Sequence, residues 1–97
     1  MEGKEMVPRG DVMERIARDK KRIKTISGIH AFMKRRASEL GMDPKMAMSR
    51  ATVSNYMYGE TDPDQDWMTL FALSFELTPA EMGELAYANT FRALTAA

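Results

Sequence analysis

The chain has 97 residues, of which 44% are hydrophobic and 29% charged, a composition typical of one small globular domain rather than a multidomain enzyme. It contains no cysteine, which excludes disulfides and thiolate zinc sites and favours a reducing compartment. No apolar run reaches the roughly 18 residues that span a bilayer, so we expect a cytoplasmic protein. We also expect no metal or cofactor.

The formal net charge is zero, but the charges are divided unevenly along the chain. Residues 1–50 hold 13 basic and 7 acidic side chains, a net charge of +6, whereas residues 51–97 hold 1 and 7, a net charge of −6. One surface can therefore attract phosphates while another repels them. Two solvated helix faces would give the same pattern.

The first helix is predicted over residues 11–26, after a flexible arm of residues 1–10. Asp11 is an acceptor for the helix start and Glu14 its partner three residues later, the pattern of a capping box. Apolar residues recur at helical spacing in one stripe: Val12, Ile16, Ile23 and Ile26. Gly28 is expected to end this helix.

The second helix is predicted from Ile29 to Gly41, because glycine after the last apolar position is a common helix stop. Its apolar positions are expected to be buried: Ile29, Phe32, Met33, Ala37 and Leu40. Its basic positions are expected to be exposed: Lys34, Arg35 and Arg36.

The stretch SRATVSNYMYG predicts a short helix over about residues 49–58, with Ser49 as N-cap and Gly59 as stop. At about 100° per residue, its apolar side chains share one side: Val53, Tyr56 and Met57. The opposite side is small and polar: Ala51, Thr52, Ser54, Asn55 and Tyr58. Such a face suits the major groove of DNA, where Arg matches guanine and Asn matches adenine. A polar surface helix that binds nothing has the same pattern.

Two further capping boxes are predicted, each with a proline at the first helical position: Asp62, Pro63 and Gln65, then Thr78, Pro79 and Glu81. Between them, DWMTLFALSFEL is apolar nearly all round, as in a central helix, and its large side chains are expected in the core: Trp67, Leu70, Phe71 and Phe75. A last helix is expected from Pro79 to about Ala93. Strand signals are missing from the sequence, so it predicts an all-α bundle of about five helices forming one domain, residues 11–97.

Two segments together carry a family resemblance: ASELGM at 37–42 and SRATVSNYMYGETDP at 49–63. With the apolar helix that follows, they resemble the lambda-repressor-like (Cro/repressor) helix-turn-helix family over about residues 30–86. The matching positions are Ala37, Gly41, Ser49, Arg50, Thr52, Val53, Ser54, Gly59 and Pro63. The resemblance implies a sequence-specific DNA-binding transcriptional regulator, a repressor of phage, plasmid or bacterial type, that binds operator DNA as a homodimer.

The sequence departs from the family in the turn before the recognition helix. A helix-turn-helix usually has a turn of about three or four residues, whereas MDPKMAM separates Gly41 from Ser49. The usual spacing would put Pro44 inside a helix, where it breaks the hydrogen-bond ladder. A lengthened turn avoids that conflict. Alternatively, Asp43 caps a longer recognition helix over about residues 44–58.

The resemblance also implies roles for individual residues. The base-reading residues would be Arg50, Ala51 and Asn55. The residues near phosphates would be Ser49, Thr52, Ser54, Tyr58, Lys34, Arg35 and Arg36. Further basic candidates for the DNA backbone lie in the first helix: Arg15, Arg18, Lys20, Lys21, Arg22 and Lys24.

The C-terminal stretch MGELAYANTFRALTAA carries more apolar residues than a terminal helix of a monomer needs. We therefore predict that it pairs two protomers. The residues expected at this dimer interface are Met82, Leu85, Phe91 and Leu94. Packing of the same residues on their own core is the alternative.

Other functions fit the sequence less well. His30 is the single histidine, and no spacing signals a catalytic triad or metal site, so we do not expect an enzyme. Single-stranded RNA binding needs exposed aromatic side chains, and only Tyr58 and Tyr87 are expected to be exposed. An antitoxin-like module, which binds its operator but mainly masks a partner protein, is the main alternative to a repressor.

Overall fold

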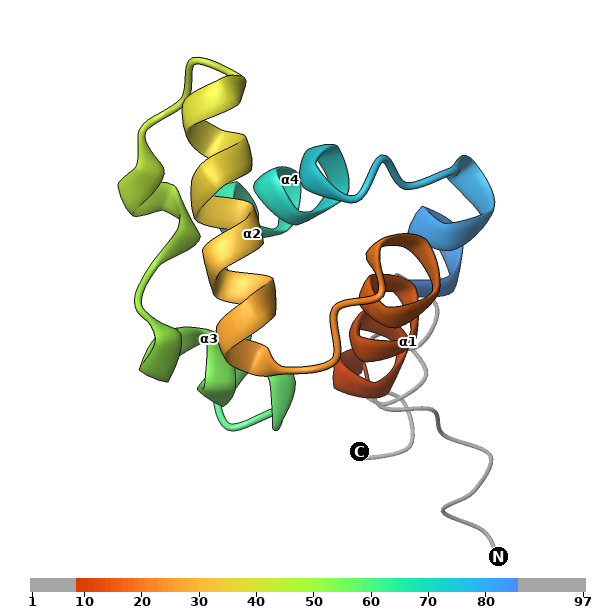
Figure 1. Ribbon diagram of the computed structural model, residues 1–97. Coiled ribbons are helices and arrows are strands. Elements are labelled where there is room, and N and C mark those ends of the chain that lie inside the picture. The colour runs from red at the N-terminus through yellow and green to blue at the C-terminus, as the bar shows by residue number, and fades with distance from the viewer. Residues whose placement is uncertain (1–8, 86–97) are drawn as a thin grey trace, which may run out of the picture.

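The computed structural model describes residues 9–85 of the chain, and within them all regular structure is helical. The elements in chain order are α1 (Arg9–Lys21), α2 (Ile26–Glu39), the 3-10 helix η2 (Pro44–Ala47), α3 (Arg50–Met57), α4 (Gln65–Ser74) and helical residues 79–85 (Figure 1). The predicted all-α class is thus confirmed: five helices and one 3-10 turn, with no strand among residues 9–85. None of the described helices is long and apolar enough to cross a membrane.

The centre of the core is α4, as the sequence predicted. Trp67, Leu70, Phe71 and Phe75 have no exposed surface. The Trp67 ring lies 5.5 Å from Phe71, and the Phe71 ring lies 4.7 Å from Phe75. Tyr56 of α3 contacts Trp67 edge-on at a centroid distance of 5.0 Å. Stacked, tilted and edge-on arrangements at these distances are favourable for aromatic pairs. A continuous aromatic row therefore joins α3 to α4.

The first two helices differ from the prediction in where one ends and the next begins. α1 ends at Lys21 instead of residue 26, because Arg22 adopts a left-handed conformation with φ 58° and the Ile23 N–H bonds to the Ala17 carbonyl. This is the geometry of a helix stop that glycine usually provides. α2 then begins at Ile26, capped by Thr25. Gly28, the predicted stop, instead donates its N–H to the Thr25 hydroxyl.

Three further details of the prediction are corrected. Asp11 lies inside the first turn of α1, which begins at Arg9, so Arg9 and Gly10 belong to this helix and not to an arm. Asp64, not Asp62, caps α4 by accepting the Trp67 N–H, since the backbone is still extended at Asp64 and the helix begins only at Gln65. Leu40, expected in the core, is 40% exposed because it lies at the C-cap of α2 and not inside the helix.

The capping box at Thr78 is confirmed and is tied to α1. The Thr78 N–H donates to Glu81 Oε1 at 2.9 Å, and the Glu81 N–H donates to the Thr78 hydroxyl at 3.1 Å. The Lys20 ammonium donates to the same Glu81 oxygen at 2.7 Å and to the carbonyls of Phe75 and Glu76. Three donors on one side chain thus hold the end of α4 and the start of residues 79–85 against α1.

Loss of the Lys20 ammonium should weaken the fold in a pH-dependent way. The hydrogen bonds from Lys20, then from Thr78, hold the pKa of Glu81 below its ordinary value of 4.5, so Glu81 stabilises the fold above that pH and loses this contribution as it becomes protonated in acid. We expect Lys20→Met to lower the free energy of unfolding by about 1–2 kcal/mol at neutral pH. The difference from wild type should narrow below pH 4.5.

Urea unfolding monitored by circular dichroism at several pH values measures this difference. Lys24→Met is the control, because Lys24 is an exposed lysine in the connection after α1 and should change stability by less than about 0.5 kcal/mol. Equal losses in the two variants would contradict the role of Lys20.

The N-terminal turn of α1 packs directly on the backbone at the end of α3. Gly10 is buried, and a Cβ atom at this position would overlap the Met57 carbonyl. Only glycine allows the two backbones to approach so closely. The contact fixes the C-terminal end of α3 from outside the helix-turn-helix segment.

Gly10→Ala should therefore destabilise the protein by about 1–3 kcal/mol, the usual result of overpacking. Gly83→Ala provides the control, since a Cβ there meets nothing within 4 Å and removes a flexible residue from a helix. That change should stabilise by about 0.5–1 kcal/mol. Thermal unfolding of both variants compares them, and a neutral Gly10→Ala would refute the close contact.

Candidate nucleic-acid interface

The start of α3 is built as the sequence predicted. Ser49 is the N-cap and accepts the Thr52 N–H at 3.1 Å, while its hydroxyl donates to Thr52 Oγ1 at 3.0 Å. The Val53 N–H bonds to the Ser49 carbonyl, which closes the first turn. Gly59, with φ 77°, follows the last turn as expected of a helix stop.

The two sides of α3 separate cleanly between core and surface. Val53, Tyr56 and Met57 are buried against the rest of the molecule. The remaining side chains form the outer face of α3, some exposed and some half-buried: Arg50, Ala51, Thr52, Ser54, Asn55 and Tyr58. Tyr58 is the most prominent of them, with 69% of its surface exposed. The outer face is therefore short, polar and accessible.

The turn before α3 combines features of the two arrangements considered from the sequence. Asp43 does cap a helix, by accepting the Lys45 N–H at 2.9 Å, with Pro44 in its first turn. That helix, η2, is a single 3-10 turn and ends at Ala47, which is fully buried. Met48 then takes a left-handed conformation with φ 63°. The recognition helix consequently does not extend back to residue 44, and the turn is lengthened but ordered.

Two side chains near the start of α2 contact the start of α3. The Ser27 hydroxyl accepts a hydrogen bond from Arg50 Nε, and His30 Nε2 donates to the Met48 carbonyl at 2.7 Å. Ser27 and His30 are three residues apart and share one face of α2. These contacts were missed from the sequence, because 23 residues separate Ser27 from Arg50 and no pattern links them. They fix both residues that flank Ser49.

The basic residues predicted on α2 do not lie together. Lys34 is exposed and follows His30 by four residues, so the two lie on the same side of α2. Arg36 and Arg35 instead bond to Glu39, at 2.6 and 3.8 Å. Arg35 also lies over the Phe32 ring, 5.3 Å from its centroid. Of the three, Lys34 alone forms no ion pair with Glu39.

Lys45 adds a further exposed cation on η2, directly before α3. The sequence assigned it no role, because residues 43–48 were expected either as a lengthened turn or as the start of a longer recognition helix. Together with Lys34 and Arg50, it provides positive charge around the N-terminal end of α3. The backbone N–H groups of a helix start favour anions at the same end.

The residues predicted for dimerisation are described only in part. Leu85 is buried at 4% exposure, whereas Met82 is 52% exposed. Phe91 and Leu94 lie outside the described residues. The pairing of two protomers therefore stays a prediction at this stage.

Comparison with known proteins adds no relative to this geometry. No protein family, no curated protein sequence and no solved structure matches the chain.

Removal of the Ser49 cap should shorten α3 and weaken the fold. Ser49→Ala leaves the Thr52 N–H without its acceptor, so we expect a loss of about 1 kcal/mol in the free energy of unfolding. Ser49→Asp is the control, because aspartate is an equally good cap and should preserve stability. Urea unfolding measures both, and an equal loss in the two variants would contradict a capping role.

Proposed function

We propose that this protein is a sequence-specific double-stranded DNA-binding regulator of transcription that reads its site with α3. The observation that carries the proposal is the outer face of α3, a capped helix with an exposed arginine at its first turn and small polar side chains beyond it. B-DNA admits one α-helix in its major groove, roughly 12 Å wide, and presents donor and acceptor patterns there. Small side chains let the helix backbone approach the base edges.

Individual side chains of α3 suit different parts of that groove. Arg50 is proposed to read guanine and Asn55 adenine, each through paired hydrogen bonds, while Ala51 packs against a thymine methyl group. Ser49, Thr52, Ser54 and Tyr58 carry hydroxyl groups that can bond phosphate oxygens and fix the docking.

Positive charge on neighbouring elements supports the proposal that α3 faces the DNA. Lys34 lies one turn of α2 after His30, which bonds to the Met48 carbonyl, and Lys45 lies on η2, the element before α3. Both lysines are exposed and are proposed to contact the DNA backbone. Arg35 and Arg36 remain candidates for backbone contacts at the edge of the interface, although both bond to Glu39 in the free protein. We propose repression as the mode of regulation, through occlusion of a promoter by a bound homodimer.

Selection of bound sites from random duplex DNA tests this function. The wild-type protein should enrich one motif, and Arg50→Ala and Asn55→Ala should each relax preference at a different position. A lost bidentate contact corresponds to about 1–3 kcal/mol of discrimination. Arg35→Ala is the comparison, because a contact to the DNA backbone carries no base-specific information, so its loss should leave the enriched motif unchanged even if affinity falls.

Two results would reject the proposal. The first is failure of the folded wild-type protein to enrich any motif. The second is an unchanged motif in both Arg50→Ala and Asn55→Ala. Ser49→Asp adds a further check, because its negative charge at the interface should weaken binding to all duplexes alike while the protein stays folded.

A further inference from the structure

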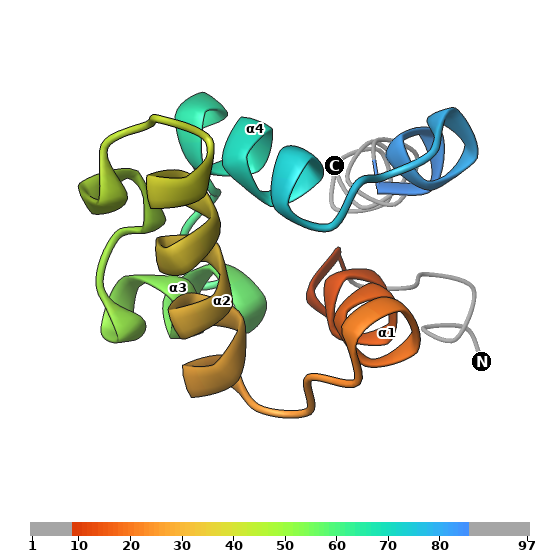
Figure 2. The same ribbon diagram turned by 45° about the horizontal axis from the view of Figure 1, so that its top comes forward.

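The start of α3 lies beside the start of α2, although Ser27 and Arg50 are 23 positions apart along the chain. Figures 1 and 2 both show how this arises: after the end of α2, the chain returns alongside this helix through η2, so that α3 begins next to the first turn of α2. There the Ser27 hydroxyl accepts a hydrogen bond from Arg50 Nε. The residue proposed to read guanine therefore contacts a second helix before any DNA is bound.

The hydrogen bond between Ser27 and Arg50 joins two segments whose backbones are already ordered. Thr25 caps the first turn of α2 by accepting the Gly28 N–H. Ser27 is exposed, and it lies two residues, or about 200° around the helix, from the buried Ile29. Arg50 is the first residue of α3 and follows the N-cap directly. The position of the Ser27 hydroxyl is thus fixed by the core and not by its partner.

The contact determines which part of the Arg50 side chain is left for a ligand. A guanidinium carries one N–H on Nε and four on its two Nη atoms. Because Ser27 accepts the Nε–H, the edge formed by the two Nη atoms stays available for a pair of acceptors. Arginine otherwise loses much rotamer freedom when it binds, and a contact already made in the free protein reduces that loss.

The acceptor is neutral, so Arg50 keeps its charge for the DNA. Arg35 and Arg36 both pair with Glu39. Among residues 9–85, by contrast, no carboxylate forms an ion pair with Arg50. A carboxylate in place of Ser27 would also hold the guanidinium, but it would cancel the charge that attracts phosphates and strengthens hydrogen bonds to guanine.

We propose that Ser27 is a positioning residue that sets the base preference of Arg50. The inference rests on the proposed function of α3 and adds a residue of α2 to those that determine the DNA site. Ser27 acts through Arg50, because it holds Nε and leaves the two Nη atoms for the base edge. Guanine is the base that presents two acceptors, O6 and N7, in the major groove, so this orientation selects it.

Affinity measurements on the selected site and its single-base variants test this role. The position to vary is the one at which Arg50→Ala relaxes the preference. Ser27→Ala should lower the preference for guanine there about tenfold, the effect expected for one hydrogen bond to a charged group. The preference at the position read by Asn55 should not change. Ser27→Thr keeps the hydroxyl and should stay within about twofold of wild type.

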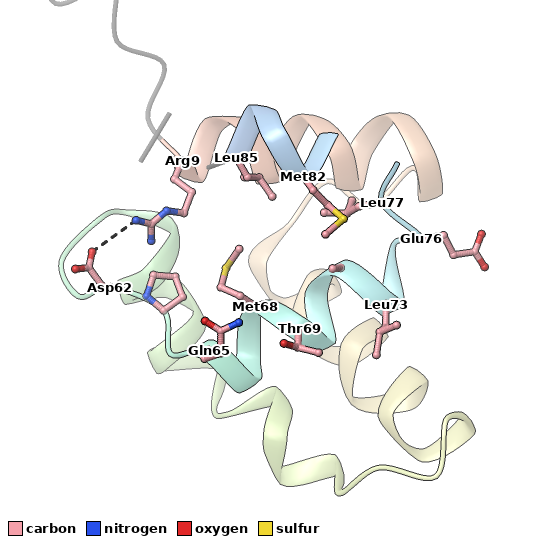
Figure 3. Close-up of a pocket in the computed structure, with 12 residues that line it drawn as sticks. Arg9, Asp62, Gln65, Met68, Thr69, Leu73, Glu76, Leu77, Met82 and Leu85 are labelled. Atoms are coloured by element: carbon pink, nitrogen blue, oxygen red, sulfur yellow. Dashed lines mark ion pairs between the residues drawn. The ribbon is translucent and has the colours of Figure 1, made fainter. Parts of the chain in front are cut away.

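Thr69→Ala is the control, because it also removes an exposed hydroxyl from a helix, in this case α4. Figure 3 shows Thr69 at a cleft of about 760 Å³ between α4 and helical residues 79–85. None of the residues that line this cleft belongs to α2 or α3, so the base preference should equal that of wild type. Circular dichroism checks that every variant is folded.

The double variant Ser27→Ala/Arg50→Ala separates positioning from an independent contact. It should discriminate no less than Arg50→Ala alone, because Ser27 acts only through Arg50. Additive losses would overturn the inference, as would an unchanged preference in Ser27→Ala, a uniform loss of affinity for all duplexes, or equal losses in Ser27→Ala and Ser27→Thr. Each of these results leaves the proposed function standing. A folded wild type that enriches no motif would reject the proposed function and this inference with it.

Discussion

The burial of α4 is the interaction on which the rest of the structure depends. Trp67, Phe71 and Phe75 stack along this helix, and Phe32 of α2 extends the aromatic row at a centroid distance of 5.0 Å from Phe75. Two polar atoms, Trp67 Nε1 and Ser74 Oγ, are buried in this core without hydrogen-bond partners in the described part of the chain. An unpaired buried donor or acceptor costs about 1–3 kcal/mol, which the large apolar area of the aromatic row offsets.

The outer face of α3 is accessible to solvent because the opposite face of the helix packs against this core. Val53 and Met57 are buried beside Tyr56, so the helix cannot rotate without exposing apolar surface. Its two ends are fixed from different elements, by Ser27 and His30 of α2 at the start and by the close approach of Gly10 at the end. A short helix with few internal hydrogen bonds thus acquires a defined position from its neighbours.

The sequence predicts best what depends on local chemistry or on strong apolar patterning. The core position of α4, the Ser49 cap and the Thr78 capping box all follow from a few adjacent residues and are confirmed. The break after α1 could not be predicted, because a charged residue, Arg22, occupies the left-handed position that glycine usually signals.

Contacts between residues that are far apart in the sequence could not be predicted either. Lys20 bonds to residues more than 50 positions away, and the Ser27 contact to Arg50 has no sequence signature. The sequence predicted Asp62 as the N-cap of α4, whereas Asp64 is the cap. Both residues lie in the same acidic run, and only the local backbone conformation distinguishes them. The roles proposed for the outer face of α3 depend on a ligand and stay predictions.

Met48, with its left-handed backbone conformation, lies between the end of η2 and the N-cap of α3. η2 starts with its own cap at Asp43, and α3 starts with its own cap at Ser49, so neither helix start takes its capping side chain from the other helix. Insertions at the exposed start of this connection, before the buried Ala47, would change its path while the start of α3 keeps its cap. The entropy of loop closure rises only slowly with length, so such changes need not unfold the domain. The segment before Ala47 is therefore the place where the connection can vary in length without changing the contacts that hold α3.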